Sequence, residues 1–103
     1  YSYYEYSFII EVEIAPTVFV LSQNYPNPFN PTTVIKYQIP KSEFVSLKVF
    51  DVPGNEVATL VNEEKSAGTY EVDFDAAQLS SGIYFYQIRA GEYSDTIKMI
   101  LLR

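Results

Sequence analysis

Apolar and polar side chains alternate along most of this chain, which is the pattern of β-strands that bury one face. The first such stretch covers residues 1–14, where serine or glutamate occupies several odd positions. From residue 4 onward every even position is apolar or aromatic: Tyr4, Tyr6, Phe8, Ile10, Val12 and Ile14. The pattern predicts a long N-terminal strand, about 45 Å at roughly 3.3 Å per residue. Its continuous apolar face requires a partner.

The same alternation recurs in short stretches through the rest of the chain. Thr33, Ile35, Tyr37 and Ile39 share one predicted face, and further strands are expected over residues 45–49, 56–61, 70–74, 83–88 and 93–102. The four glycines, at positions 54, 68, 82 and 91, all fall in predicted turns. One of these, residues 52–55, is expected to be a type II turn with Pro53 and Gly54 at its centre. Strands and turns at this spacing predict an all-β fold, an Ig-like antiparallel β-sandwich of about seven strands with the long N-terminal strand added.

Residues 23–31, Gln-Asn-Tyr-Pro-Asn-Pro-Phe-Asn-Pro, interrupt the alternation. Three closely spaced prolines exclude a regular strand interior or a helix. The segment is interpreted as an extended crossing between strands, with Tyr25 and Phe29 as its anchors. A second interpretation is a recognition surface, because a backbone fixed by proline loses little entropy on binding. Its candidate residues are Asn24, Pro26, Asn27, Pro28, Asn30 and Pro31.

Composition excludes several kinds of function. The chain has no histidine and no cysteine, so a Ser-His-Asp triad, a cysteine nucleophile and an ordinary zinc site are excluded. The net charge of −6 argues against nucleic acid and anionic lipid as partners. No enzymatic activity, cofactor or small-molecule substrate is expected. The N-terminus lacks the basic region of a signal peptide, so we expect either a leader already removed or a fragment of a longer protein.

Four blocks of sequence resemble a known family. They are LSQNYPNPFNPTT (21–33), VSLKVFDVPGNEVATLV (45–61), AGTYEVDFDAAQLSSGIYFYQI (67–88) and KMILLR (98–103). In this order they resemble the type A C-terminal sorting domain of the bacterial type IX secretion system. The resemblance implies an Ig-like domain over residues 17–103, at the end of a larger secreted protein. It also implies recognition by an outer-membrane translocon after passage through the periplasm. In that family a surface sortase then commonly removes the domain, leaving the cargo attached to the cell surface or released into the medium.

The last strand allows two interpretations. As part of the core it supplies Ile97, Met99 and Leu101. As a signal it offers exposed backbone hydrogen bonds to a receptor, since edge strands are commonly captured by strand addition. The resemblance supports a role for the terminal residues in recognition. The candidates are Lys98, Leu101, Leu102 and Arg103.

Residues 1–16 lie outside the resemblance and leave three alternatives. They form the last strand of an upstream domain, a strand of this sandwich, or a donor strand that completes the next copy and builds a filament. The favoured function is a non-catalytic sorting domain. The domain is either retained or cleaved by a partner, and cleavage is expected in the linker around residues 15–21. The alternative is a self-associating filament subunit that uses residues 1–14. A carbohydrate-binding sandwich is a weaker third hypothesis.

Overall fold

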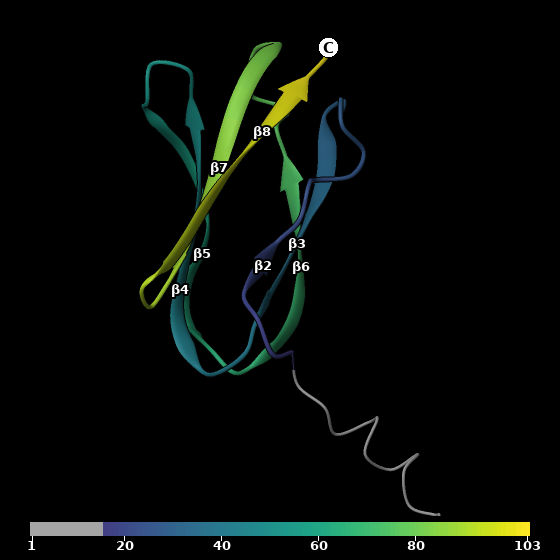
Figure 1. Cartoon of the computed structure of the whole chain (residues 1–103). Coiled ribbons are helices and arrows are strands. Elements are labelled where there is room, and N and C mark those ends of the chain that lie inside the picture. The colour runs from purple at the N-terminus through teal and green to yellow at the C-terminus, as the bar shows by residue number, and fades with distance from the viewer. Residues whose placement is uncertain (1–15) are drawn as a thin grey trace, which may run out of the picture.

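Two antiparallel β-sheets stack face to face in residues 16–103, the part of the chain that the computed structural model describes (Figure 1). The smaller sheet has the order β2-β3-β6 and contains β2 (Val20–Leu21), β3 (Thr32–Ile39) and β6 (Gly68–Asp75). The larger sheet has the order β5-β4-β7-β8 and contains β5 (Glu56–Lys65), β4 (Glu43–Asp51), β7 (Gly82–Ala90) and β8 (Tyr93–Leu101). This is an Ig-like β-sandwich of seven strands, which confirms the predicted fold class. The strand predicted over residues 1–14 lies outside the described residues.

The core lies between the sheets and is filled by every second residue of the strands. The predicted face of β3 is confirmed, since Ile35, Tyr37 and Ile39 are buried. The other sheet contributes buried side chains from β4, β7 and β8, which include Val45, Leu47, Val49, Tyr86, Ile88, Met99 and Leu101. Each such side chain stabilises the fold by about 1.5–3 kcal/mol relative to exposure. No helix within residues 16–103 is long and apolar enough to span a membrane.

Two tyrosines fix the chain where it enters a strand. The Tyr70 hydroxyl donates to the Ser66 carbonyl at 2.6 Å, and the Tyr84 hydroxyl donates to the Ser80 carbonyl at 2.7 Å. Each bond reaches back four residues, as in the tyrosine corner of Ig-like domains. These bonds position β6 and β7 relative to the loops before them.

Strand β5 is longer than the sequence predicts. The prediction ends at residue 61, whereas the strand continues to Lys65, which pairs with Glu43 of β4. The added residues are mostly polar and exposed, because β5 lies at the edge of the larger sheet. Their pairing rests on backbone hydrogen bonds to β4, and these leave no hydrophobic pattern in the sequence.

The turn between β4 and β5 is shifted by one residue from the predicted frame. The Gly54 amide donates to the Asp51 carbonyl at 3.0 Å, so Val52 and Pro53 are central and Gly54 follows with φ of 101°. The Asp51 carboxylate selects this frame, since its Oδ1 accepts from the Gly54 and Asn55 amides at 3.0 and 2.7 Å. The side-chain hydrogen bond from Asn55 holds the pKa of Asp51 below its ordinary value.

Candidate functional site

The two predicted recognition segments lie side by side in the fold. The Asn-Pro segment, residues 23–31, leaves β2 on the smaller sheet and reaches β8 at the edge of the larger sheet. At its start, Tyr25 exchanges two backbone hydrogen bonds of 3.0 Å with Val34 of β3. Near its end, Phe29 forms a parallel bridge with Leu101 of β8. The segment and the C-terminus therefore form one continuous surface, which sequence alone did not bring together.

Hydrogen bonds from the Asn-Pro segment occupy the outer edge of β8 near the C-terminus. The Phe29 amide donates to the Ile100 carbonyl, and the Phe29 carbonyl accepts from the Leu102 amide, both at 2.9 Å. Asn27 Oδ1 accepts from the Ile100 amide at 3.0 Å, and Gln23 Nε2 donates to the Lys98 carbonyl at 2.9 Å. The prediction that the last strand offers exposed backbone hydrogen bonds to a receptor is therefore wrong for these groups, because the Asn-Pro segment supplies their partners.

Asn24 is buried beneath the segment, with 2% of its surface exposed. Its Nδ2 donates to the Pro26 carbonyl at 3.1 Å and to Thr33 Oγ1 at 3.0 Å. Its Oδ1 accepts from Gln23 Nε2 at 2.7 Å, and Thr33 Oγ1 donates to the Pro26 carbonyl at 2.8 Å. The two polar side chains thus satisfy each other inside the fold, as burial requires. In the folded domain Asn24 holds the path of the segment and does not reach its surface.

The two aromatic residues of the segment have opposite surroundings. Phe29 is 2% exposed and packs against Phe74, with ring centroids 6.1 Å apart, so the prediction that it is an anchor is confirmed. Tyr25 is 81% exposed, and the same prediction is wrong for it. Its backbone is held against Val34, but its ring lies outside the core. Both aromatic residues lie next to prolines in the sequence, so the sequence offers no basis for predicting that one is exposed and the other buried.

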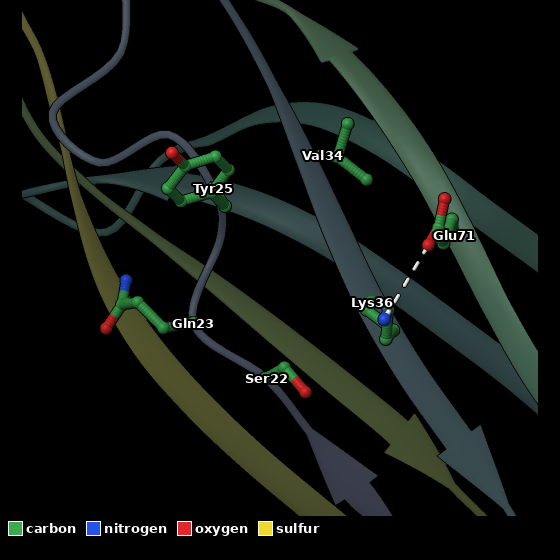
Figure 2. A pocket seen from close by; sticks show the side chains of 6 residues that line it. All are labelled: Ser22, Gln23, Tyr25, Val34, Lys36 and Glu71. Atoms are coloured by element: carbon green, nitrogen blue, oxygen red, sulfur yellow. Dashed lines mark ion pairs between the residues drawn. The ribbon is translucent and has the colours of Figure 1, made fainter.

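Two hollows lie along the Asn-Pro segment beside β3 and β6, and Tyr25 lines the first of them. Figure 2 shows the first, of about 400 Å³, which is lined by Ser22, Gln23, Tyr25, Val34, Lys36 and Glu71. The second, of about 330 Å³, is lined by Pro26, Thr32, Thr33, Val34 and Asp73. Val34 borders both hollows, and Lys36 Nζ lies 3.7 Å from Glu71 Oε2 across the first. The surface around Tyr25 therefore combines an aromatic ring, an aliphatic side chain and charged groups.

Arg103 is tied to the loop between β6 and β7. Its Nη1 donates to the carbonyls of Ala76, Ala77 and Leu79 at 3.2, 2.8 and 2.7 Å. Its backbone amide donates to Ser81 Oγ at 2.9 Å. The terminal cation therefore stabilises this loop in the folded domain, a role that the sequence did not reveal.

The other recognition candidates differ in their exposure. Leu101 is buried in the core and Pro31 is half-buried. Six candidates are exposed besides Arg103: Pro26, Asn27, Pro28, Asn30, Lys98 and Leu102. Their role in recognition stays a prediction. The donor-strand candidates Tyr4, Tyr6, Phe8, Ile10, Val12 and Ile14 lie outside the described residues.

The start of the folded domain overlaps the predicted cleavage linker. The Phe19 ring stacks on Tyr93 with centroids 4.8 Å apart, and Val20 and Leu21 pair with β3. Just after them, the Ser22 carbonyl accepts from the Tyr86 hydroxyl at 2.5 Å. Burial raises the pKa of Tyr86 to about 12. A linker around residues 15–21 therefore has its second half within the fold.

Metal chemistry finds no support in this part of the chain. Within residues 16–103 no three His, Cys, Asp or Glu side chains lie close enough together to hold a metal ion. The acidic side chains next to the Asn-Pro segment, Glu71 and Asp73, are exposed on the outer side of β6. This surface also presents the exposed ring of Tyr25.

The comparisons with known proteins agree with this fold. The family model described as a secretion system C-terminal sorting domain matches residues 23–102. Among solved structures, a chain of PorZ from Porphyromonas gingivalis is similar, with a TM-score of 0.55 and 22% identity. PorZ is described as an essential bacterial surface component of the type-IX secretion system of that organism. The similarity covers 82% of this chain and 11% of the PorZ chain, and at this identity it shows the fold alone. A search of curated proteins gave no match.

Proposed function

This chain belongs to the family of secretion system C-terminal sorting domains, and we propose that it directs a larger secreted protein through the type IX system. In this proposal the domain is read by the outer-membrane translocon, and its cargo reaches the cell surface or the medium. The domain performs no chemistry of its own. The absence of histidine and cysteine supports a role based on binding.

The observation that carries the proposal is the pairing of the Asn-Pro segment with the end of β8. Phe29 joins the two through backbone bonds of 2.9 Å to Ile100 and Leu102. Both parts lie within the matched residues 23–102. We infer that they form a single recognition surface, so a receptor that reads it contacts only a correctly folded domain. Sorting would then depend on folding as well as on sequence.

The proposed fate of the domain is removal by a surface sortase. The stacking of Phe19 on Tyr93 and the pairing of Val20 with Gln38 support cleavage before residue 19. Extended, accessible backbone is what a protease needs, and residues held in a sheet do not offer it. The domain would then separate from the cargo with all of its strands still in one piece.

A reporter assay tests the proposal. A fluorescent protein with a signal peptide is fused to the 103-residue chain and expressed in a type IX-competent host and in a translocon-deficient strain. We expect fluorescence at the surface or in the medium only in the competent strain. Retention in the periplasm of both strains, with the domain folded, would refute the proposal. A second fusion to residues 17–103 shows whether residues 1–16 contribute.

A further inference from the structure

We propose that Tyr25 is the side chain through which the Asn-Pro segment contacts its protein partner, and that this partner presents an apolar pocket with a basic rim. The inference rests on the proposed function, since the partner is part of the secretion machinery. The sequence predicts Tyr25 as an anchor of the segment, and Tyr25 is not among the predicted recognition residues.

The exposed ring of Tyr25 stands on a backbone that hydrogen bonds hold in place. Tyr25 is 81% exposed, although its amide and carbonyl are both bonded to Val34 at 3.0 Å. On one side Asn24 is buried, and on the other the Pro26 carbonyl accepts from Asn24 and Thr33. A tyrosine has only two side-chain torsions, so little entropy is lost when its ring is bound. Burial of this ring by a partner would therefore stabilise a complex with little opposing cost.

The surface beside the ring is hollowed. Tyr25 lines a hollow of about 400 Å³ (Figure 2). A second hollow, of about 330 Å³, is bordered by the next residue, Pro26, and Val34 borders both hollows. An exposed ring beside a hollow can enter a pocket of the partner while side chains of the partner fill the hollow. Interlocking contacts of this kind surround the aromatic residues that dominate protein interfaces.

Acidic side chains lie beside the ring. The exposed side chains of β6 are Thr69 and the three carboxylates Glu71, Asp73 and Asp75. The ion pair between Lys36 and Glu71 is long, at 3.7 Å, and both side chains are more than half exposed. Such a pair neutralises little of the negative charge, so the row of exposed carboxylates on β6 remains acidic. A basic protein surface complements it, whereas a neutral sugar gains nothing from the charge and an anionic surface is repelled.

Export kinetics of the full-chain reporter fusion provide the test. Truncating a dominant interface residue weakens binding by about 30-fold or more. We expect Tyr25→Ala to slow export by at least about tenfold in a pulse-chase experiment, and Tyr25→Phe to export at the wild-type rate. The matched control is Phe44→Ala, since Phe44 is an exposed aromatic residue (52%) on the other sheet. Thermal unfolding of each variant establishes that it is folded.

The charge of the partner is tested by a second pair of variants. We expect Glu71→Lys with Asp73→Lys to slow export, because both place cations against a basic rim. The control is Glu63→Lys with Glu64→Lys on β5, which changes the net charge equally and also disrupts one surface ion pair, Glu63 with Lys65 at 3.3 Å. Equal rates for the two double variants would overturn the basic rim.

The outcomes separate this inference from the proposed function. If the wild-type fusion is not exported, the proposed function fails. If it is exported and folded Tyr25→Ala is exported equally fast, or if Phe44→Ala is slowed as much, the inference fails and the proposed function stands. Chemical-shift changes at Tyr25 and Val34 on addition of millimolar cellobiose would assign the surface to sugar binding and also overturn it.

Discussion

Deletion of residues 98–103 is the simplest way to remove the proposed C-terminal signal, but we expect this deletion to unfold the domain. The deleted stretch contains Met99 and Leu101, both fully buried in the core. It also contains the two residues, Ile100 and Leu102, that bond to the backbone of Phe29. Without them the Asn-Pro segment loses its partner on the larger sheet.

The magnitudes decide this outcome. Loss of a buried methionine or leucine side chain costs about 2–5 kcal/mol each, even when the backbone remains. Each lost backbone hydrogen bond adds about 0.5–1.5 kcal/mol, so the two bonds of Phe29 bring the total to roughly 5–13 kcal/mol. A domain of this size has an unfolding free energy of about 5–15 kcal/mol. The deletion therefore removes most or all of the stability.

Circular dichroism of the tyrosines in the near ultraviolet and amide NMR dispersion measure the result. We expect the truncated chain to show neither fixed aromatic signals nor a cooperative unfolding transition at 25 °C. A cooperative transition within a few degrees of that of the full chain would refute the reasoning. It would mean that the end of β8 contributes little to the core.

Export of single variants separates the signal from the fold. Lys98→Ala and Leu102→Ala change exposed side chains, and each is expected to alter stability by about 0.5 kcal/mol or less. Arg103→Ala removes three hydrogen bonds to carbonyls of the loop after β6 and is expected to cost about 1–2 kcal/mol. If Lys98→Ala or Leu102→Ala slows export while stability is unchanged, the side chain acts in the signal and not in folding. The deletion cannot make this distinction.

Three further predictions concern the buried parts of the site. Phe29→Ala empties a fully enclosed position and is expected to destabilise the domain by about 3–5 kcal/mol in urea unfolding. Asn24→Ala leaves Thr33 with fewer partners in a buried site, and we expect a loss of about 1–3 kcal/mol in the same measurement, with Thr33→Ala adding less when the two are combined. Burial raises the pKa values of Tyr37 and Tyr86 to about 12. The unfolded chain releases these protons near pH 10, whereas the folded chain does not. The contribution of the two tyrosines to the unfolding free energy is therefore complete below pH 10 and is lost between about pH 10 and 12. The loss is at most about 1.4 kcal/mol per pH unit for each tyrosine. Thermal unfolding across this range, with tyrosinate absorbance, measures that loss.

The strands of the core could be predicted because burial leaves a pattern of period two. In β3, the alternation of Ile35, Tyr37 and Ile39 with more polar residues identified the buried face correctly. The same holds for Met99 and Leu101 in β8. These elements are long enough, and their faces different enough, for the side chains alone to specify which face points inward.

Polar edge strands and long-range contacts could not be predicted in this way. The end of β5, Asn62–Lys65, pairs with β4 through its backbone while its side chains are largely solvated. The contrast between Tyr25 and Phe29 depends on which residue meets β8, a contact between residues more than 70 positions apart. The role of Arg103 depends on a loop 24–27 residues before it. Local patterns hold no information on such contacts.

The protection of the sheet edges bears on what a receptor can read. The Asn-Pro segment covers the end of β8, since Phe29 and Asn27 bond to its outer backbone groups. On the opposite side, the edge strands β5 and β6 carry mostly charged exposed residues, which disfavour pairing with another strand. Strand addition is thus opposed at the end of β8 by a covering segment and at β5 and β6 by charge. The receptor that we propose would then recognise side chains on a folded surface, and Tyr25 is the aromatic side chain of the Asn-Pro segment that is exposed on a fixed backbone.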